Sequence, residues 1–242
     1  TELYPDKAHF IYELLQNADD ANATKVEIRL DKNGFLFKHN GTIHFTISDP
    51  NKAEEDGKKG KYGHLNALTG IGSSSKLEGA EGNKIGKFGI GFKSVFKYTA
   101  HPHVYDDIIC FVLHDYILPE RLNEDHSWRQ SGETLFYLPF DKPGMSPKES
   151  YSQIEEKLKT LENPILFLHH IQSIHWKSAT NNGGTYSKEL LKTIKQDNVL
   201  CEQIKLHNFS SKDTRELWMF TKNIHLEEGS FPISVGLYIK EG

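Results

Sequence analysis

The sequence predicts a two-layer α+β sandwich, with helices on one face of a mixed, mostly antiparallel sheet. Three observations predict this fold class. Helical and strand-like segments are mixed along the 242 residues, short turns of hairpin type join the early strands, and no repeat at a solenoid period is present. Antiparallel strands joined by tight turns form sheets that helices cover on one side only.

The first elements follow from side-chain periodicity. Residues 6–21 are predicted to form a helix, because apolar side chains recur at helical spacing after Pro5. Strands are expected at 25–30, 35–39 and 43–47, with turns at Asn33-Gly34 and Asn40-Gly41. The apolar stripe of the helix consists of Phe10, Ile11, Leu14, Leu15 and Ala18.

A polar, glycine-rich segment follows, at about residues 49–86. Of the 19 glycines, ten fall between Gly57 and Gly91, which excludes a regular element over most of this stretch. A short helix is expected only near 64–69. Such a density of glycine indicates either a disordered loop or a backbone that approaches a ligand closely.

The second half of the chain alternates between both element types. Helices are predicted at 92–98 and 148–161, and strands at 108–113, 134–138 and 171–176. Further strand-like runs lie at 203–207, 216–220 and 233–239, beyond a loop at 181–184. We therefore expect one domain over 1–176 and a strand-rich C-terminal extension of the same unit over 177–242.

Composition limits the class of protein. The net charge of −4 does not favour a nucleic-acid surface, and no apolar run approaches the roughly 20 residues of a membrane span. Cys110 and Cys201 make neither a disulfide framework nor a zinc site, so a reducing, cytoplasmic location is expected. Because the chain begins at Thr1, we expect it to be a piece of a longer protein.

Three polar side chains follow one line of the first predicted helix. Glu13, Asn17 and Asp20 stand at positions i, i+4 and i+7, opposite the apolar stripe. One interpretation is a solvated face. The other is a cation site, because carboxylate and amide oxygens suit a hard cation and an activated water. Asn is a poor helix former, so its position in mid-helix favours the second interpretation.

A second feature is the segment from Gly86 to Ser94, which reads GKFGIGFKS and leads into a helix. Backbone N–H groups without neighbouring side chains, at a helix start, form a cradle for anions. The spacing is neither that of a Walker loop nor that of a dinucleotide fingerprint.

Taken together, these motifs resemble the GHKL ATPases. ELLQNADDA, FLFKHNG, IGSSSK, GKFGIGFKSVFKYT and HDYILPERL are most similar to the sacsin-type branch, and they lie between residues 12 and 139. The resemblance implies the Bergerat fold with a glycine-rich ATP lid, as in the N-terminal domain of the ninety-kilodalton heat-shock chaperone. It also implies ATP as substrate and Mg²⁺ as cofactor.

The resemblance assigns roles to individual residues. Glu13 matches the residue that polarises the attacking water, and Asn17 matches the Mg²⁺ ligand. Thr134 matches a threonine that supports the adenine. Positions beside the nucleotide are Asp20 and Ala21. The lid anchor corresponds to Gly72, Ser73, Ser74 and Lys76. The phosphate loop corresponds to Gly86, Lys87, Phe88, Gly89, Ile90, Gly91 and Phe92.

One position departs from the family pattern. Where the superfamily has Asp-x-Gly, with the Asp accepting the adenine amino proton, this chain has His39-Asn40-Gly41. A neutral imidazole nitrogen or the Asn40 amide oxygen would accept such a proton without a carboxylate's charge. Asp49 is the alternative adenine reader.

The function expected from the resemblance is slow, Mg²⁺-dependent ATP hydrolysis. It would close the lid, at about 51–84, and drive a conformational change in a larger chaperone-like or bacterial defence-type protein. An alternative is a nucleotide-binding switch with little or no hydrolysis. A histidine-type kinase is disfavoured because that branch lacks the glutamate, and a purely structural module would leave the lid and glycines unexplained.

Expected partners are ATP or ADP, further domains of the same longer chain, and a second copy bound through those domains. Neither a membrane nor nucleic acid is expected. Within 12–139 the cations near the presumed γ-phosphate are lysines, so a stabilising Arg or Lys is expected from outside the fragment. These lysines are Lys76, Lys87 and Lys93.

Overall fold

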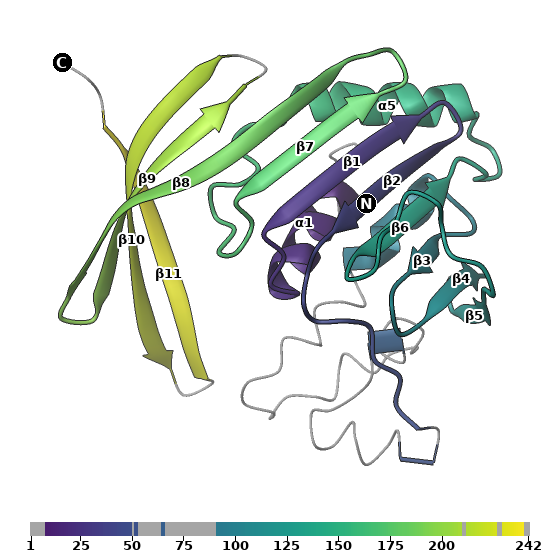
Figure 1. Ribbon diagram of the computed structural model, residues 1–242, viewed down its shortest axis with the longest axis horizontal. Helices are drawn as coiled ribbons and strands as arrows, with labels where there is room; N and C mark the ends of the chain where they lie inside the picture. Colours follow the sequence, from purple (N-terminus) through teal and green to yellow (C-terminus); the bar gives the residue numbers. More distant parts are fainter. Residues whose placement is uncertain are drawn as a thin grey trace.

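The computed structural model describes residues 8–49, 51–52, 64–65, 91–209, 212–226 and 229–239. Their strands form one 11-stranded sheet in the order β11-β10-β9-β8-β7-β1-β2-β6-β3-β4-β5. Among the described strands, every hydrogen-bonded pair is antiparallel except β1 with β7. Helices α1 and α5 lie on the same face of the sheet (Figure 1). The predicted fold class, a mixed and mostly antiparallel sheet with helices on one face, is confirmed.

The first three elements lie close to their predicted positions. Helix α1 spans Phe10–Asp20, and its predicted apolar stripe is buried. Strand β1 spans Lys25–Asp31 and buries every second residue, as expected for a strand with one face on the core. Strand β2 spans Gly34–His39 and is buried on both faces, so it lies at the centre of the molecule.

The strand predicted at 43–47 is wrong. The chain leaves the sheet after β2 because Thr42 and Ile43 donate their backbone N–H groups to Ala21 O, at 2.9 and 3.2 Å. The position beside β2 is taken by β6 (Thr134–Pro139), which pairs with it along its whole length. Ile43 and Ile47 are therefore exposed, and only Phe45 of this alternating run is buried.

The middle of the chain adds the strands at one end of the sheet. These are β3 (His103–Tyr105), β4 (Cys110–His114) and β5 (Leu118–Arg121). Strand β4 was predicted, with its start two residues and its end one residue too early, whereas β3 and β5 were not predicted. Strand β3 has only three residues, and β5 is exposed on both faces, so neither carries a periodic signal.

The later helices fit their local sequence. The predicted helix at 92–98 is mostly a 3₁₀ helix, η3 (Lys93–Lys97). Helix α5 spans Pro147–Lys159 and is capped by Ser146, whose Oγ accepts from Glu149 N at 3.2 Å. Of the short helix predicted at 64–69, only residues 64 and 65 are described, and both are helical. No described helix combines the length and apolar character that a crossing of the bilayer requires.

The C-terminal strands extend the sheet as a wing on the left of Figure 1. They are β7 (Ser173–Ser178), β8 (Gly183–Gln196), β9 (Val199–Asn208), β10 (Asp213–Leu226) and β11 (Gly229–Tyr238). Strand β7 pairs in parallel with β1, and β8 pairs with β7 across the position where the C-terminal extension was expected to begin. The division at residue 176 stays a prediction.

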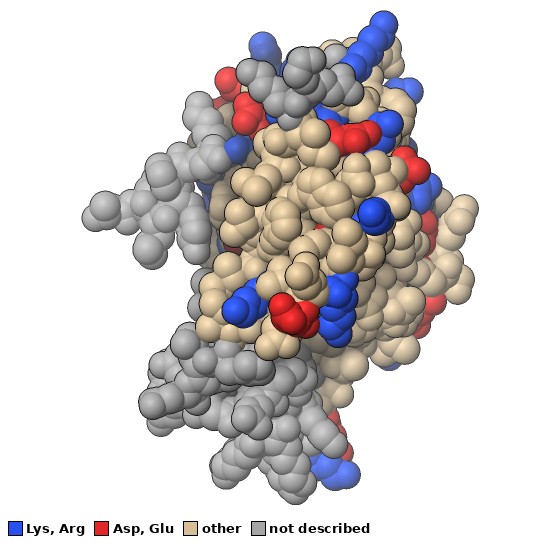
Figure 2. All heavy atoms as spheres, turned by 90° about the vertical axis from the view of Figure 1, so that its left-hand side faces the viewer, with Lys and Arg blue, Asp and Glu red and all other residues tan. Residues whose placement is uncertain are grey.

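The outer surface of this wing carries few charges. Figure 2 shows a broad area without Lys, Arg, Asp or Glu at its centre and charged side chains around it. Strands β8, β10 and β11 contribute many of the exposed large apolar side chains of the described residues. They include Leu190, Ile224, Ile233, Val235 and Leu237.

Candidate functional site

Glu13 and Gly91, which are far apart in the sequence, lie in direct contact. A Cβ atom built on Gly91 would stand 1.8 Å from Oε2 of Glu13, so the carboxylate packs against bare backbone. Any side chain at position 91 would displace it. The helix motif and the last glycine of the predicted phosphate loop are therefore at one place. His9 lies one helical turn before Glu13, with Nε2 at 3.5 Å from Oε1.

Asn17 lies one turn further along α1 and is only 6% exposed. Its Nδ2 atom is buried without a hydrogen-bond partner among the described residues. A buried amide without a partner costs free energy, so native structures rarely contain one unless a ligand or an ordered water completes it. An amide oxygen is among the ligands that a hard cation such as Mg²⁺ accepts, so the type of residue at position 17 is compatible with such a cation.

The two acids at the end of α1 have different surroundings. Asp20, the one singled out from the sequence, is partly exposed. Asp19 is buried and accepts three backbone N–H groups, from His169, His170 and Ile171, at 2.8, 2.7 and 3.0 Å. Asp19 therefore holds the chain that enters β7 against the helix. The available sequence signal was an unfavourable pair of acids at a helix C-terminus, where the helix dipole disfavours negative charge.

Ala21 and Gly41 also lie against each other. A Cβ atom on Gly41 would meet Ala21 O at 2.8 Å and Ala21 Cβ at 2.9 Å, so no side chain fits there. The chain after β2 is thus fixed to the end of α1 by close backbone packing, in addition to the hydrogen bonds to Ala21 O described above.

The Asn40 side chain binds the segment that enters β1. Its Oδ1 accepts from the backbone N–H groups of Thr24 and Lys25, at 3.0 and 2.8 Å, and its Nδ2 donates to Thr24 Oγ1 at 2.9 Å. A carbonyl oxygen has two lone pairs, and both are used here. Asn40 therefore ties the end of β2 to the start of β1, and its oxygen is not open to a base.

His39 is buried at the end of β2. Its Nδ1 accepts from the backbone N–H of Gly41 at 3.1 Å, and its ring stacks on Phe136 with centroids 6.1 Å apart. Burial lowers the pKa of His39 to about 4, so the ring is neutral at pH 7. A neutral imidazole that accepts at Nδ1 carries its proton on Nε2.

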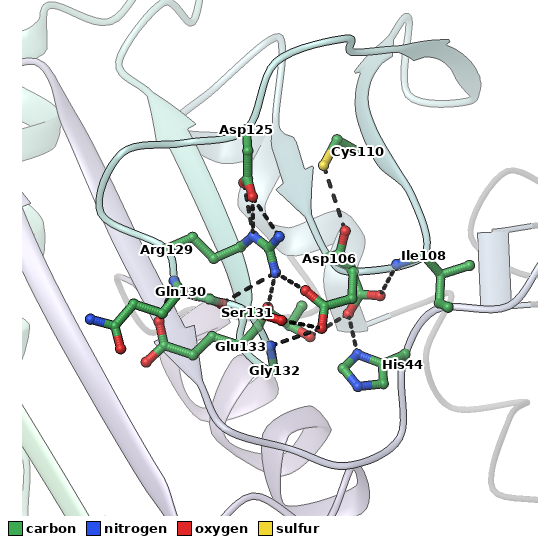
Figure 3. Close-up of polar contacts among 12 residues, drawn as sticks. His44, Asp106, Ile108, Cys110, Asp125, Arg129, Gln130, Ser131, Gly132 and Glu133 are labelled. Carbon is green, nitrogen blue, oxygen red and sulfur yellow. Dashed lines mark hydrogen bonds and ion pairs between the residues drawn. The ribbon is translucent and has the colours of Figure 1, made fainter.

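Thr134 stands opposite His39 in the register of β2 and β6. It is 1% exposed, and its Oγ1 donates to Oδ2 of Asp106 at 2.6 Å. Asp106 follows β3, and its side chain is completely buried. The same oxygen lies 3.1 Å from Nδ1 of His44, and Oδ1 accepts from Ile108 N at 3.1 Å (Figure 3). Sequence reasoning missed Asp106, because it belongs to no motif and stands between two short strands.

An ion-pair cluster holds the end of β3 near the start of β6. Arg129 donates to Oδ1 of Asp107 at 2.6 Å, to Oδ1 of Asp125 at 2.8 Å and to Glu133 O at 2.8 Å (Figure 3). Gly132 N donates to Oδ2 of Asp107 at 2.8 Å. Hydrogen bonds to Asp125 and Asp107 raise the pKa of Arg129 despite its burial. These contacts hold the backbone on both sides of the contact between Asp106 and Thr134 in place.

The remaining predicted positions divide into two groups. Phe92 is buried, with its ring 5.8 Å from that of Phe136. Asp49 is exposed and caps its own turn by accepting from Asn51 N at 2.9 Å. Outside the described residues lie Gly72, Ser73, Ser74, Lys76, Gly86, Lys87, Phe88, Gly89 and Ile90.

Two known proteins are similar to this chain in sequence. The chain is 30% identical to Protein NO VEIN of Arabidopsis thaliana over 203 residues, which are 75% of this chain and 7% of that protein. It is 33% identical to human Sacsin over 107 residues, or 42% of this chain and 2% of that protein. The chain thus spans less than a tenth of the length of these relatives.

Among solved structures, two ATPase domains of MutL from Aquifex aeolicus are similar. One, with a K252N mutation, has a TM-score of 0.37 at 11% identity, over 91% of this chain and 78% of that one. The other has a TM-score of 0.33 at 13% identity, over 80% and 69%. At these values the structural likeness adds nothing to the sequence match. The family model described as the Sacsin domain matches residues 1–125, just over half of the chain, and the chain therefore belongs to the sacsin domain family.

Proposed function

We propose that this domain binds ATP with Mg²⁺ and hydrolyses it slowly to ADP and phosphate. The observation that carries the proposal is the contact between the Glu13 carboxylate and the bare backbone of Gly91. A carboxylate beside a glycine-rich loop is the arrangement required to hold a water next to a phosphate. Membership of the sacsin domain family supports the same proposal.

Each residue of the site has a defined task in this proposal. Glu13 orients a water in line with the terminal phosphate and accepts its proton. Asn17 presents its side-chain oxygen to Mg²⁺, and the metal, when bound, offsets the negative charge of the phosphates. The bare backbone at Gly91 lets the Glu13 carboxylate lie directly against the loop, because no side chain stands there.

Lid closure would connect hydrolysis to the rest of a longer protein. The described part of the lid region is attached beside the site, since Leu65 N donates to Thr46 O at 3.1 Å and His64 N to Thr46 Oγ1 at 3.2 Å. We propose that nucleotide binding moves residues 51–84 over the site and that this change is passed to further domains, in a chaperone-like or defence-type role.

The test separates binding from chemistry. In Glu13→Gln we expect ATP affinity, measured by titration calorimetry with Mg²⁺, to change by less than about twofold. Single-turnover hydrolysis should fall by roughly 10²-fold or more, because the base is lost while the shape is kept. Gln16→Ala, an exposed change on the same helix, is the matched control and should alter neither quantity.

Each outcome has a distinct meaning. Unchanged turnover in Glu13→Gln would exclude the general-base role. A parent protein that binds ATP without hydrolysing it would support the nucleotide-operated switch instead. Absence of ATP binding at millimolar nucleotide would overturn the proposal as a whole.

A further inference from the structure

We propose that this chain reads a purine base with a fixed donor, Nε2–H of His39, and a fixed acceptor, Oγ1 of Thr134. Asp106 acts through Thr134 as a positioning residue. The inference rests on the proposed function. A carboxylate at position 39 would accept a hydrogen bond from the base, whereas the Nε2–H of His39 donates one. Base recognition then depends on a ring nitrogen at least as much as on the amino group.

The donor is set by a hydrogen bond from closely packed backbone. Gly41 N–H occupies Nδ1 of His39, so the single proton of the neutral ring lies on Nε2. Gly41 is in turn held against Ala21, where even a methyl group would clash. A flip of the ring would place the Cδ2 carbon, which cannot accept, against the Gly41 N–H and lose this hydrogen bond. His39 is thus held as a donor.

The acceptor is set by a buried carboxylate. A hydroxyl group has one proton, and Thr134 uses it in a 2.6 Å hydrogen bond to Asp106. A carboxylate only accepts, so His44 must also donate to it through Nδ1, and Ile108 N donates to the other oxygen. The lone pairs of Thr134 Oγ1 are what remains for a ligand.

The two groups are neighbours with the same orientation. His39 and Thr134 are directly opposed in the antiparallel register of β2 and β6, so both side chains leave the sheet on one face. Adenine presents the complementary pair on adjacent atoms, with N1 as an acceptor and the 6-amino group as a donor. We therefore expect N1 to receive the His39 proton and Thr134 to accept from the amino group.

The experiment uses three nucleotides with Mg²⁺ and titration calorimetry. They are ATP, its 1-deaza analogue, which lacks N1, and its analogue that lacks the 6-amino group. For the parent protein, we expect removal of N1 to weaken binding by about 3–10-fold, the effect of one hydrogen bond. Removal of the amino group should weaken binding by no more than this.

Variants then test each group separately. His39→Phe should bind ATP and 1-deaza-ATP within about twofold of each other, because the donor is gone. His39→Asp should shift the discrimination to the amino group. Asp106→Asn should reduce the discrimination against the analogue without the amino group. The amide of the new asparagine can donate to Thr134 Oγ1, so the threonine hydroxyl is no longer held as an acceptor for the base. Asp141→Asn, which changes the same kind of Asp–Thr–His cluster elsewhere, should leave all three affinities unchanged.

A readout on the parent protein keeps the inference testable if a variant does not fold. Long-range ¹⁵N correlation spectra should show the neutral Nε2–H form of His39 at pH 7. An Nδ1–H form, or a parent protein that discriminates by the amino group and not by N1, would overturn the inference while leaving ATP binding intact. Absence of any ATP binding would overturn both this inference and the proposed function.

Discussion

The two ends of the β3–β6 strand pair carry the same set of groups. At the inner end, Asp106 binds a threonine hydroxyl, a histidine Nδ1 and a backbone N–H. At the outer end, Asp141 accepts from Thr99 Oγ1 at 3.0 Å and Ala100 N at 2.7 Å, and it lies 2.6 Å from His101 Nδ1. The chemistry of the two clusters is therefore alike.

Their solvent exposure is different. The Asp106 side chain is completely buried and its histidine 28% exposed, whereas Asp141 is 34% exposed and its histidine 45% exposed. Hydrogen bonds are electrostatically stronger where water is excluded, and an unpaired group there costs more. The comparison indicates that the buried cluster can determine which atoms of its threonine and histidine carry protons. The same kind of cluster at the surface mainly holds neighbouring segments of backbone together.

The largest expected difference is in stability. Asp106→Ala removes the acceptor of the Thr134 hydroxyl and of Ile108 N inside the protein, and we expect it to lower the free energy of unfolding by about 2–4 kcal/mol. Urea unfolding followed by circular dichroism measures this. A loss below that of Asp141→Ala would contradict the comparison.

The surface cluster should contribute less. Asp141→Ala is expected to lower the free energy of unfolding by about 1 kcal/mol at pH 7, since water can replace the carboxylate for part of its partners.

Its contribution should also depend on pH. Burial alone would raise the pKa of Asp141, but hydrogen bonds from Ala100, His101 and Thr99 together lower it below its ordinary value. A lowered folded-state pKa gives stability that is present above the unfolded pKa and is lost as pH falls through the folded value. The difference between parent and Asp141→Ala should therefore shrink below about pH 4. A difference that stayed constant down to pH 2.5 would exclude this linkage.

The smallest effect concerns the exposed histidine. His101→Gln keeps a hydrogen-bond donor near Asp141, and we expect a change in unfolding free energy within about 0.5 kcal/mol, as for ordinary surface substitutions. His44→Gln, beside the buried Asp106, should cost more. Equal costs would mean that burial does not separate the two clusters.

Much of the fold could be predicted from the sequence because the central elements have strong periodicity. Helix α1 and strands β1 and β2 bury their apolar faces as the pattern indicates. Strand β8 was missed because beyond Ser187 its side chains are mostly exposed, so no alternation marks it. The run at 43–47 alternates like a strand, yet β6 occupies the place beside β2 where a hairpin would have put it.

The residues of the candidate site that belong to sequence motifs could be predicted. The residues that act through tertiary contacts could not. Glu13 and Gly91 belong to short patterns, and the fold brings them together. Asp106 acts through Thr134 on a distant segment, and no motif beside it in the sequence identifies it. Asp19 also binds a distant segment, and its only local signal is the pair of acids at the helix C-terminus. The engaged state of the Asn40 amide likewise appears only when its neighbours from β1 are in place.

The parallel pairing of β1 with β7 has a consequence for how the chain folds. Lys25 pairs with Ser173, so one edge of β1 has no partner until more than half of the chain has been synthesised. Among the described strands, β8 to β11 are connected to β1 through β7, so they join the rest of the sheet after this step. Contacts between such distant segments slow folding, and an unpaired strand edge is prone to association. Refolding should therefore be slow, and chains truncated before Ser173 should aggregate.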